Sequence, residues 1–427
     1  MIKVLTVIGT RPEAIKLAPV LTELARRSTE FESRVVVTGQ HKEMLEQMLA
    51  LFEIEPHHDL AVMEPGQSAS EVTSKVLDGL APILSAERPD WIIVQGDTTT
   101  AMAASLAAFY EKVPVAHVEA GLRTFDKYSP FPEEVNRRMT GVIADIHFAP
   151  TSWAATNLLR ESVPSERIMI TGNTCIDALD ETAKLPFDKA ASQVADVPDD
   201  ARVVLVTAHR SENFGRPVAQ IAAAISRLSY RNPDLHFVFP MHLNPKVRGP
   251  VLRELAGIDN VTLTNPLEYP EMVWMIDRAD VVVTDSGGLQ EEAAGSGTPV
   301  LVMRDSTERP EGVDAGLAKL VGTDRDRLVR EVERLVRDRG KHREMTSNES
   351  PYGDGNAAHR IVETLAGRKV EPTTGVYETP EPEHPFDKLL HAATAEIPRE
   401  YADKVIARGR RVRRAQPLES GETSRTR

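Results

Sequence analysis

Three carboxylates near the ends of predicted strands could accept and donate a proton. Asp97 follows the apolar run 91–95, Glu119 follows the run 115–118, and Glu133 begins a predicted helix after the loop 119–132. Carboxyl groups gathered at one edge of a sheet raise some pKa values and lower others, which produces proton donors and acceptors. Each could instead only cap a helix, as Asp97 could, or form an ion pair, as Glu133 could with Arg137. Taken together, the three favour proton chemistry.

A second stretch, residues 281–292, is typical of an anion site. Three valines predict a buried strand, Ser286-Gly287-Gly288 form a turn, and residues 289–296 predict a helix. At such a turn the free backbone N–H groups and the positive end of the helix dipole point at one place. Glu292, in the first turns of this helix, could accept two neighbouring hydroxyls, as a ribose would offer. The alternative is an ordinary strand–helix turn with Ser286 as its cap.

Basic residues also gather after predicted strands or in the adjoining loops and helix starts. His209 could neutralise a phosphate or protonate a leaving oxygen, although it could also be a strand-end histidine bonded to backbone. Arg309 suits a phosphate or carboxylate, whereas Lys16 could be a solvated helix residue. An acidic protein with cations placed in this way suits a small polyanion. The basic residues concerned are Arg11, Lys16, Arg123, Arg137, Arg210 and Arg309.

Composition excludes several classes of protein. The chain has 427 residues and a formal net charge of −13, so two domains are expected and nucleic acid is not the main partner. No apolar run approaches the roughly 20 residues of a membrane span. The N-terminus runs directly into a strand, so no signal peptide is expected, and the single Cys175 excludes an internal disulfide framework. We therefore expect a cytoplasmic protein. Metal-ligand spacings and a Gly-x-Ser-x-Gly elbow are both missing from the sequence, so we expect neither a metal nor a cofactor.

Strands alternate with helices along most of the chain. This pattern predicts an α/β fold of two Rossmann-like, doubly wound parallel-sheet domains that face each other across a cleft. Predicted strands are 3–8, 34–38, 91–95, 115–118, 146–149, 168–171, 203–207, 236–239, 261–263, 281–284 and 300–303. Predicted helices are 14–27, 43–51, 71–84, 99–110, 133–144, 152–161, 218–229, 246–255, 269–278, 289–296, 325–337 and 357–365.

The same pattern predicts the domain boundaries. Residues 1–171 form the N-terminal domain, 172–354 the C-terminal nucleotide-binding domain with linker-like residues 180–200, and 355–367 pack back on the first domain. Residues 368–427 are a largely linker-like tail with an amphipathic helix expected at 386–407 and a basic cluster at 408–414. A surface tail of little structure is the plain interpretation, and a contact with nucleic acid or membrane is the alternative.

Nine motifs in this order resemble those of one known family. They are Gly9-Thr-Arg-Pro-Glu-Ala-Ile-Lys16, Gly96-Asp-Thr-Thr-Thr100, His117-Val-Glu-Ala-Gly-Leu-Arg123, Pro130-Phe-Pro-Glu-Glu134, Asn136-Arg137, Thr207-Ala-His-Arg210, His242-Leu-Asn-Pro245, Asp285-Ser-Gly-Gly-Leu-Gln-Glu-Glu292 and Thr307-Glu-Arg-Pro-Glu311. From about residue 3 to residue 366 the chain resembles the non-hydrolysing UDP-N-acetylglucosamine 2-epimerases, which have a GT-B-like fold.

The resemblance implies inversion at C2 of UDP-GlcNAc to give UDP-ManNAc, by elimination of UDP to a 2-acetamidoglucal and re-addition. It implies a homodimer, no cofactor, and hinge motion that closes the cleft around the glucal. Asp97, Glu119 and Glu133 are then the acid/base candidates, with the individual proton transfers left open. His209 assists at the diphosphate, with Arg11, Lys16, Arg137 and the Ser286-Gly287-Gly288 turn nearby. Glu292 holds the ribose hydroxyls, and Arg309 acts close to the sugar.

The resemblance also implies a second UDP-GlcNAc site, beside the active site, that activates the enzyme. Its pattern is present here in part, as Gln40, Glu134, Arg210 and His242, but Glu43, Gly66 and Ser211 depart from it. Other functions remain open from the sequence: a GT-B glycosyltransferase that needs an acceptor, an epimerase that hydrolyses its UDP-sugar, or a sugar-nucleotide-binding regulator without turnover.

Overall fold

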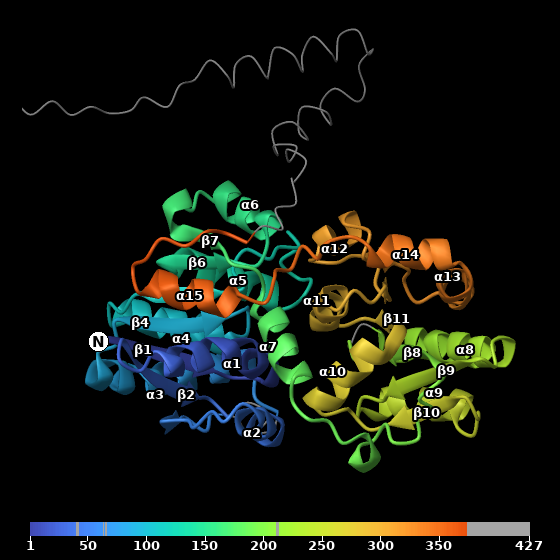
Figure 1. The fold of residues 1–427 in the computed structure, drawn as a ribbon. Coiled ribbons are helices and arrows are strands. Elements are labelled where there is room, and N and C mark those ends of the chain that lie inside the picture. The colour runs from blue at the N-terminus through green and yellow to red at the C-terminus, as the bar shows by residue number, and fades with distance from the viewer. Residues whose placement is uncertain (40–41, 63, 65, 211–212, 374–427) are drawn as a thin grey trace, which may run out of the picture. The chain divides into compact units, whose positions relative to one another are not determined.

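A computed structural model of the chain describes residues 1–39, 42–62, 64, 66–210 and 213–373 (Figure 1). Its two sheets pair their strands in parallel throughout the described residues. The predicted α/β fold of two Rossmann-like halves is confirmed.

The first sheet has the strand order β3-β2-β1-β4-β5-β6-β7. Because the order reverses between β1 and β4, their carboxyl ends flank the place where such sheets bind ligands. The central strands are buried runs of β-branched residues, as expected for a sheet covered on both faces. The strands are β1 Ile2–Ile8, β2 Phe31–Val37, β3 His58–Asp59, β4 Trp91–Gln95, β5 Val115–Val118, β6 Ile146–Ala149 and β7 Ile168–Ile170.

Helices cover both faces of this sheet. Apolar side chains of α1, α2, α7 and α15 share one core, and those of α3 and α4 form most of the core on the other face. The late helix α15 therefore packs beside α1, far from its neighbours in sequence (Figure 1). These helices are α1 Arg11–Arg26, α2 Lys42–Leu51, α3 Ala69–Glu87, α4 Thr99–Tyr110, α5 Glu133–Ile143, α6 Ser152–Arg160, α7 Thr174–Ala183 and α15 Ala357–Leu365, with a short 3-10 turn at Ser165–Arg167.

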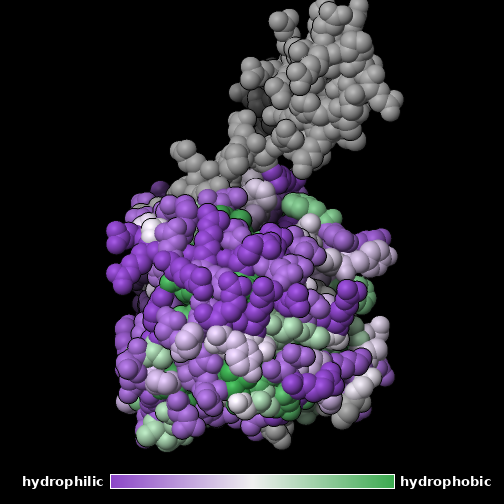
Figure 2. All heavy atoms as spheres, turned by 90° about the vertical axis from the view of Figure 1, so that its right-hand side faces the viewer, coloured by the Kyte–Doolittle hydropathy of each residue, from purple (hydrophilic) through white to green (hydrophobic). Residues whose placement is uncertain are grey.

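The second sheet repeats this plan with the order β10-β9-β8-β11-β12-β13, so its reversal lies between β8 and β11. Helices α8, α9 and α13 share the core on one face, while α10 and α11 cover the other. Hydrophilic residues dominate the face of this half seen in Figure 2. The strands are β8 Arg202–Thr207, β9 Leu235–Pro240, β10 Val261–Thr264, β11 Ala279–Thr284, β12 Val300–Val302 and β13 Ala318–Leu320. The helices are α8 Arg216–Arg231, α9 Pro245–Leu255, α10 Tyr269–Arg278, α11 Gly287–Gly295, α12 Pro310–Asp314, α13 Arg325–Arg337 and α14 Arg339–Thr346, with a 3-10 turn at Lys189–Ala191.

The chain passes between the halves twice, and the two passages touch. A Cβ added to Gly172 would lie 3.1 Å from the Cα of Gly353, and both glycines have positive φ values, of 86° and 118°. The backbone N–H of Asn173 donates to the carbonyl oxygen of Tyr352 at 2.7 Å. Only glycine tolerates both the close approach and this backbone conformation without strain.

Some predicted features differ from the structure or fall outside it. Helix α7 was not predicted, and its last residues belong to the segment expected to be a linker. The predicted helix 386–407 and the basic cluster 408–414 lie outside the described residues. Among the helices that are described, none has the length and apolar character needed to cross a membrane.

Candidate active site

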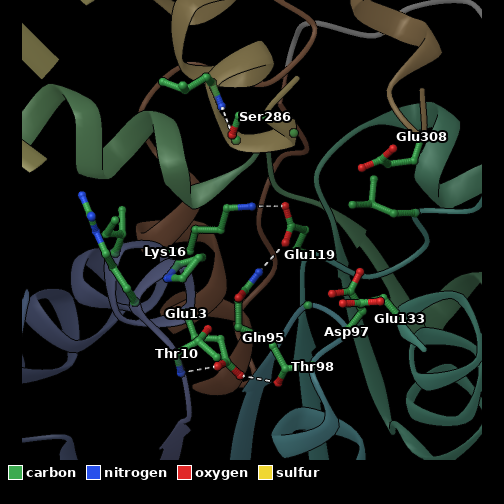
Figure 3. A pocket seen from close by; sticks show the side chains of 18 of the residues that line it. Thr10, Glu13, Lys16, Gln95, Asp97, Thr98, Glu119, Glu133, Ser286 and Glu308 are labelled. Atoms are coloured by element: carbon green, nitrogen blue, oxygen red, sulfur yellow. Dashed lines mark hydrogen bonds and ion pairs between the residues drawn. The ribbon is translucent and has the colours of Figure 1, made fainter. Parts of the chain in front are cut away.

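The carboxyl ends of both sheets line one pocket with a volume of about 450 Å³. Loops after β1, β4 and β5 enter it from the first half, and loops after β8 and β11 enter it from the second. Of the twelve residues predicted to act in catalysis or substrate binding, all line this pocket: Arg11, Lys16, Asp97, Glu119, Glu133, Arg137, His209, Ser286, Gly287, Gly288, Glu292 and Arg309. Figure 3 shows several of them converging from both halves.

Asp97 pairs with an arginine and does not cap a helix. Its carboxylate accepts hydrogen bonds from Nε of Arg137, at 3.0 Å, and from Nη2. The cap of α4 is the next residue, Thr98, whose Oγ1 accepts from the N–H of Ala101. The capping interpretation of Asp97 is therefore wrong. The possible pair between Glu133 and Arg137 is not formed, because Arg137 pairs with Asp97 and Glu134. The short turn after β4 places the Asp97 carboxylate in the pocket.

Glu133 lies beside Asp97 in a mostly dry position (Figure 3). Its Oε2 atom is buried and has no hydrogen-bond partner among the described residues. Burial raises the pKa of Glu133, and the negative charge of Asp97 raises it further. A carboxyl group whose pKa is raised in this way holds its proton to a higher pH, so Glu133, beside Asp97, can act as a proton donor.

Glu119 is held as an anion at the end of β5. Its backbone adopts the left-handed conformation, with φ of 61°, which is uncommon for a residue other than glycine and turns the chain sharply after the strand. Lys16 and Asn173 donate to Oε1, the latter at 3.0 Å, and Gln95 donates to Oε2. Burial alone would raise the pKa of Glu119, but the charges of Lys16 and Arg309 outweigh it and lower that pKa. A carboxylate in this state accepts a proton rather than donating one.

Charged groups from the second half complete a buried network around Glu119. Lys16 Nζ lies 3.5 Å from Oε2 of Glu291 on α11, and Arg309 Nη2 lies 3.8 Å from Glu119 Oε1. Arg309 also donates to Glu291 at 2.7 Å and to Glu308 at 2.6 Å. These contacts join the two halves across the pocket, and each of the two buried cations lies against more than one carboxylate.

The turn after β11 caps helix α11 and also lines the pocket. The Oγ of Ser286 accepts from the N–H of Leu289 at 3.5 Å, so the capping interpretation is confirmed while the residue also lines the pocket. A Cβ on Gly287 would lie 2.7 Å from Nη1 of Arg309, so this glycine is needed to seat the guanidinium. A Cβ on Gly288 would meet no atom within 4 Å, and the space beside it is open.

Glu292 lies deeper along α11 and accepts a hydrogen bond from the hydroxyl of Tyr269 at 3.2 Å. Burial raises the pKa of Glu292 to about 7. The side chain of Arg11 reaches the same region from the first half, where its Nη2 donates to the carbonyl oxygen of Leu267 at 3.3 Å. A carboxylate placed between these groups can accept hydroxyls from a ligand.

His209 follows β8 and remains partly exposed at the pocket. Its Nδ1 lies 3.0 Å from Oδ1 of Asp285, and the side chain is 44% exposed. Asp285 is buried and also accepts the backbone N–H groups of His209 and Arg210, both at 3.1 Å. Burial would raise the pKa of Asp285, but His209 outweighs it and lowers that pKa. An ionised Asp285 orients the imidazole with Nε2 left for a ligand.

Of the residues expected to form a second sugar-nucleotide site, the structure describes Glu134, Arg210 and His242. Glu134 is fully buried and accepts the N–H groups of residues 124 and 125, so it fixes the loop before α5. His242 is an exposed residue whose ring lies 5.9 Å from that of Phe214, and it does not line the pocket, whereas Arg210 does. Gln40, Ser211 and the side chain of Glu43 lie outside the described residues. The second site stays a prediction.

Several pocket residues were not assigned a role from the sequence. Glu13 accepts the N–H groups of Gly9 and Thr10 and the hydroxyl of Thr98, and burial raises its pKa to about 7. Gln95, Tyr269 and Glu308 also line the pocket. Gln95 could have been found, because it ends a strand directly before Gly96-Asp97, but Tyr269 carries no comparable signal. No group of three or more metal-ligating side chains occurs in the part of the chain that is described.

Comparisons of sequence and of structure with known proteins all indicate the same family. The family model for UDP-N-acetylglucosamine 2-epimerase matches residues 23–366. The UDP-N-acetylglucosamine 2-epimerase of Escherichia coli K12 is 51% identical over 376 residues, which cover 86% of this chain and 99% of that protein. The crystal structure of UDP-GlcNAc 2-epimerase from Neisseria meningitidis bound to UDP-GlcNAc is similar with a TM-score of 0.81 and 48% identity, covering 86% of this chain and 100% of that one. The crystal structure of Methanocaldococcus jannaschii UDP-GlcNAc 2-epimerase in complex with UDP-GlcNAc and UDP is similar with a TM-score of 0.73 and 31% identity. The match covers 86% of this chain and 100% of that one.

Proposed function

Because the chain belongs to the UDP-N-acetylglucosamine 2-epimerase family and is an epimerase, we propose that it interconverts UDP-GlcNAc and UDP-ManNAc. The observation that carries the proposal is the placement of carboxylates in opposite states within one pocket. Glu119 is an ionised proton acceptor, and the Asp97–Glu133 pair is a proton donor. Inversion at a carbon requires removal of a proton from one face and delivery to the other, and two separate acidic positions suit that requirement.

The reaction proceeds by elimination and re-addition. One carboxyl position removes the C2 proton while the C1–O bond breaks, so UDP departs and a 2-acetamidoglucal remains. The other position then delivers a proton to the opposite face of C2 as the UDP oxygen re-forms the bond to C1. In the direction from UDP-GlcNAc, Glu119 takes the proton and the Asp97–Glu133 pair returns one. The reverse reaction exchanges these roles.

Cations of the pocket stabilise the departing diphosphate. Negative charge grows on the leaving oxygen during elimination, and preorganised positive groups in a dry site stabilise it strongly. His209, held by Asp285, donates to the diphosphate, while the open side of Gly288 receives it near the start of α11. Glu292 accepts the ribose hydroxyls. The arginines and lysine that line this pocket are Arg11, Lys16, Arg137, Arg210 and Arg309.

Incubation with UDP-GlcNAc in deuterated water tests this function directly. The expected result is UDP-ManNAc together with deuterium at C2 of both nucleotide sugars, without any acceptor. If C2 keeps its original hydrogen and turnover needs an acceptor, the protein is a glycosyltransferase. Free ManNAc together with UDP would identify a hydrolysing enzyme. Asp97→Asn should abolish exchange, and unchanged turnover in that variant would contradict the proposed mechanism.

We also propose that the chain forms a homodimer through the outer surface of α4 and α5. Val135, Met139 and Val142 lie three and four residues apart on α5 and are 38%, 40% and 87% exposed. At the end of α4, Phe109 and Tyr110 are 61% and 65% exposed. Sedimentation velocity should give a dimer, and Val142→Asp should shift it toward monomer. A monomeric wild-type protein at micromolar concentration would refute this interface.

A further inference from the structure

Asn173 occupies the first passage of the chain between the two halves, and its side chain reaches the pocket. The residue is 2% exposed and caps helix α7, because its Oδ1 accepts the N–H of Cys175 at 3.1 Å. Its Nδ2 donates to Glu119 Oε1 at 3.0 Å. Its backbone N–H donates to Tyr352 in the second passage. One residue therefore contacts a helix end, both passages and a carboxylate of the pocket.

Asn173 differs from the two charged groups that hold Glu119. Lys16 is shared between Glu119 and Glu291 of the second half, and Arg309 belongs to the second half altogether. The contact of Arg309 with Glu119, and that of Lys16 with Glu291, depend on how the halves are placed around a ligand. The amide of Asn173 is uncharged and anchored at the passage, so its contact with Glu119 Oε1 does not depend on the second half in that way.

We propose that Asn173 is a positioning residue for epimerisation, which fixes the orientation of the Glu119 carboxylate. The inference rests on the proposed function, in which Glu119 accepts the C2 proton. Without the amide donor, Oε1 keeps the ammonium group of Lys16, and Oε2 keeps Gln95. The carboxylate then turns about its side-chain bonds and is aligned with C2 for a smaller fraction of the time. Asn173 touches no reacting atom, so its effect passes through Glu119.

Asn173→Ser separates this role from helix capping. The serine hydroxyl caps a helix about as well as asparagine does, but it is too short to reach Glu119. We expect kcat to fall roughly ten- to hundredfold, as for loss of a hydrogen bond to a charged group, while KM stays within about twofold. Asn356→Ser makes the same change in the second passage, where the amide only donates to the carbonyl oxygen of Asp354 at 3.0 Å. That control should keep the wild-type kcat.

Two measurements decide the outcome. A wild-type kcat in Asn173→Ser would overturn the proposal, as would a fall in kcat of the same size in Asn356→Ser. A crystal structure of Asn173→Ser should contain Glu119 in more than one rotamer, and a single unchanged rotamer would also overturn it. The crystal structure tests the orienting role of Asn173 independently of activity. If the wild-type protein exchanged no hydrogen at C2, that result would refute the proposed function but would leave the test of Asn173 intact.

Discussion

The ammonium group of Lys16 is buried between two carboxylates, and its removal has a calculable cost. The side chain is 10% exposed, pairs with Glu119 and lies 3.5 Å from Glu291. Lys16→Met keeps most of the apolar chain and leaves both carboxylates without this partner. Breaking a buried ion pair in this way costs about 3–5 kcal/mol. Because Arg309 remains 3.8 Å from Glu119 and 2.7 Å from Glu291, we expect the lower end, about 3 kcal/mol.

Urea unfolding followed by circular dichroism measures this loss. Without Lys16, burial raises the pKa of Glu119, so the folded variant takes up a proton as the pH falls. The loss in the free energy of unfolding should therefore be larger at pH 8 than at pH 5. Adding Glu119→Gln removes one of the unpaired charges and should bring the double variant to within about 1–2 kcal/mol of wild type.

A matched substitution in the same half controls for loss of a lysine as such. Lys75 pairs with Glu64 at 2.8 Å, but both side chains are well exposed, so Lys75→Met should change the free energy of unfolding by less than about 1 kcal/mol. The reasoning is refuted if Lys16→Met costs no more than Lys75→Met. It is also refuted if the loss is independent of pH and is not relieved in the double variant.

Three further predictions concern acids and glycines near the pocket. Burial raises the pKa of Glu13 to about 7 from 4.5, so its contribution to stability is complete below about pH 4.5 and is lost as the pH rises through 7. Glu13→Gln should therefore reduce the difference in urea-derived unfolding free energy between pH 5 and pH 8, by up to about 3 kcal/mol, and an unchanged difference would contradict the assignment. Glu133→Gln should lower the rate of C2 exchange roughly 100- to 10,000-fold while calorimetry shows UDP binding within about threefold of wild type; equal losses in both would argue for a binding role. Gly353→Ala places a Cβ 2.9 Å from the Cα of Gly172 and should lower the melting temperature, in contrast to Gly249→Ala, where a Cβ meets nothing within 4 Å.

The fold was largely predictable because its strands are buried on both faces. Continuous β-branched runs such as 281–283 cannot be confused with surface segments, and α4 and α10 were predicted with their observed bounds, 99–110 and 269–278. Short edge elements gave no such signal. Strand β3 has two residues, and β13 has a lysine at its centre. Helix α7 was missed because the proline-containing, acidic segment after it suggested a linker that began at residue 180.

The site was predictable as a set of residues but not as a set of contacts. Strand ends in a parallel sheet share one edge, so the convergence of Asp97, Glu119 and Glu133 follows from topology. Local spacing does not determine the partner of a side chain: it made a pair between Arg137 and Glu133 possible, but Arg137 lies against Asp97. Contacts between the halves, such as Lys16 with Glu291, depend on tertiary packing that no local pattern in the sequence encodes.

The paired glycines at positions 172 and 353 have a consequence for the chemistry. Near these glycines the chain leaves β7 of the first half and returns to it at α15, so the atoms beside them would move least if one half rotated about that point. Asn173 ties Glu119 to this region, so we expect the carboxylate to keep its alignment during such a rotation. In the proposed mechanism, a Glu119 carboxylate oriented before substrate binds would leave little reorganisation energy for the elimination step.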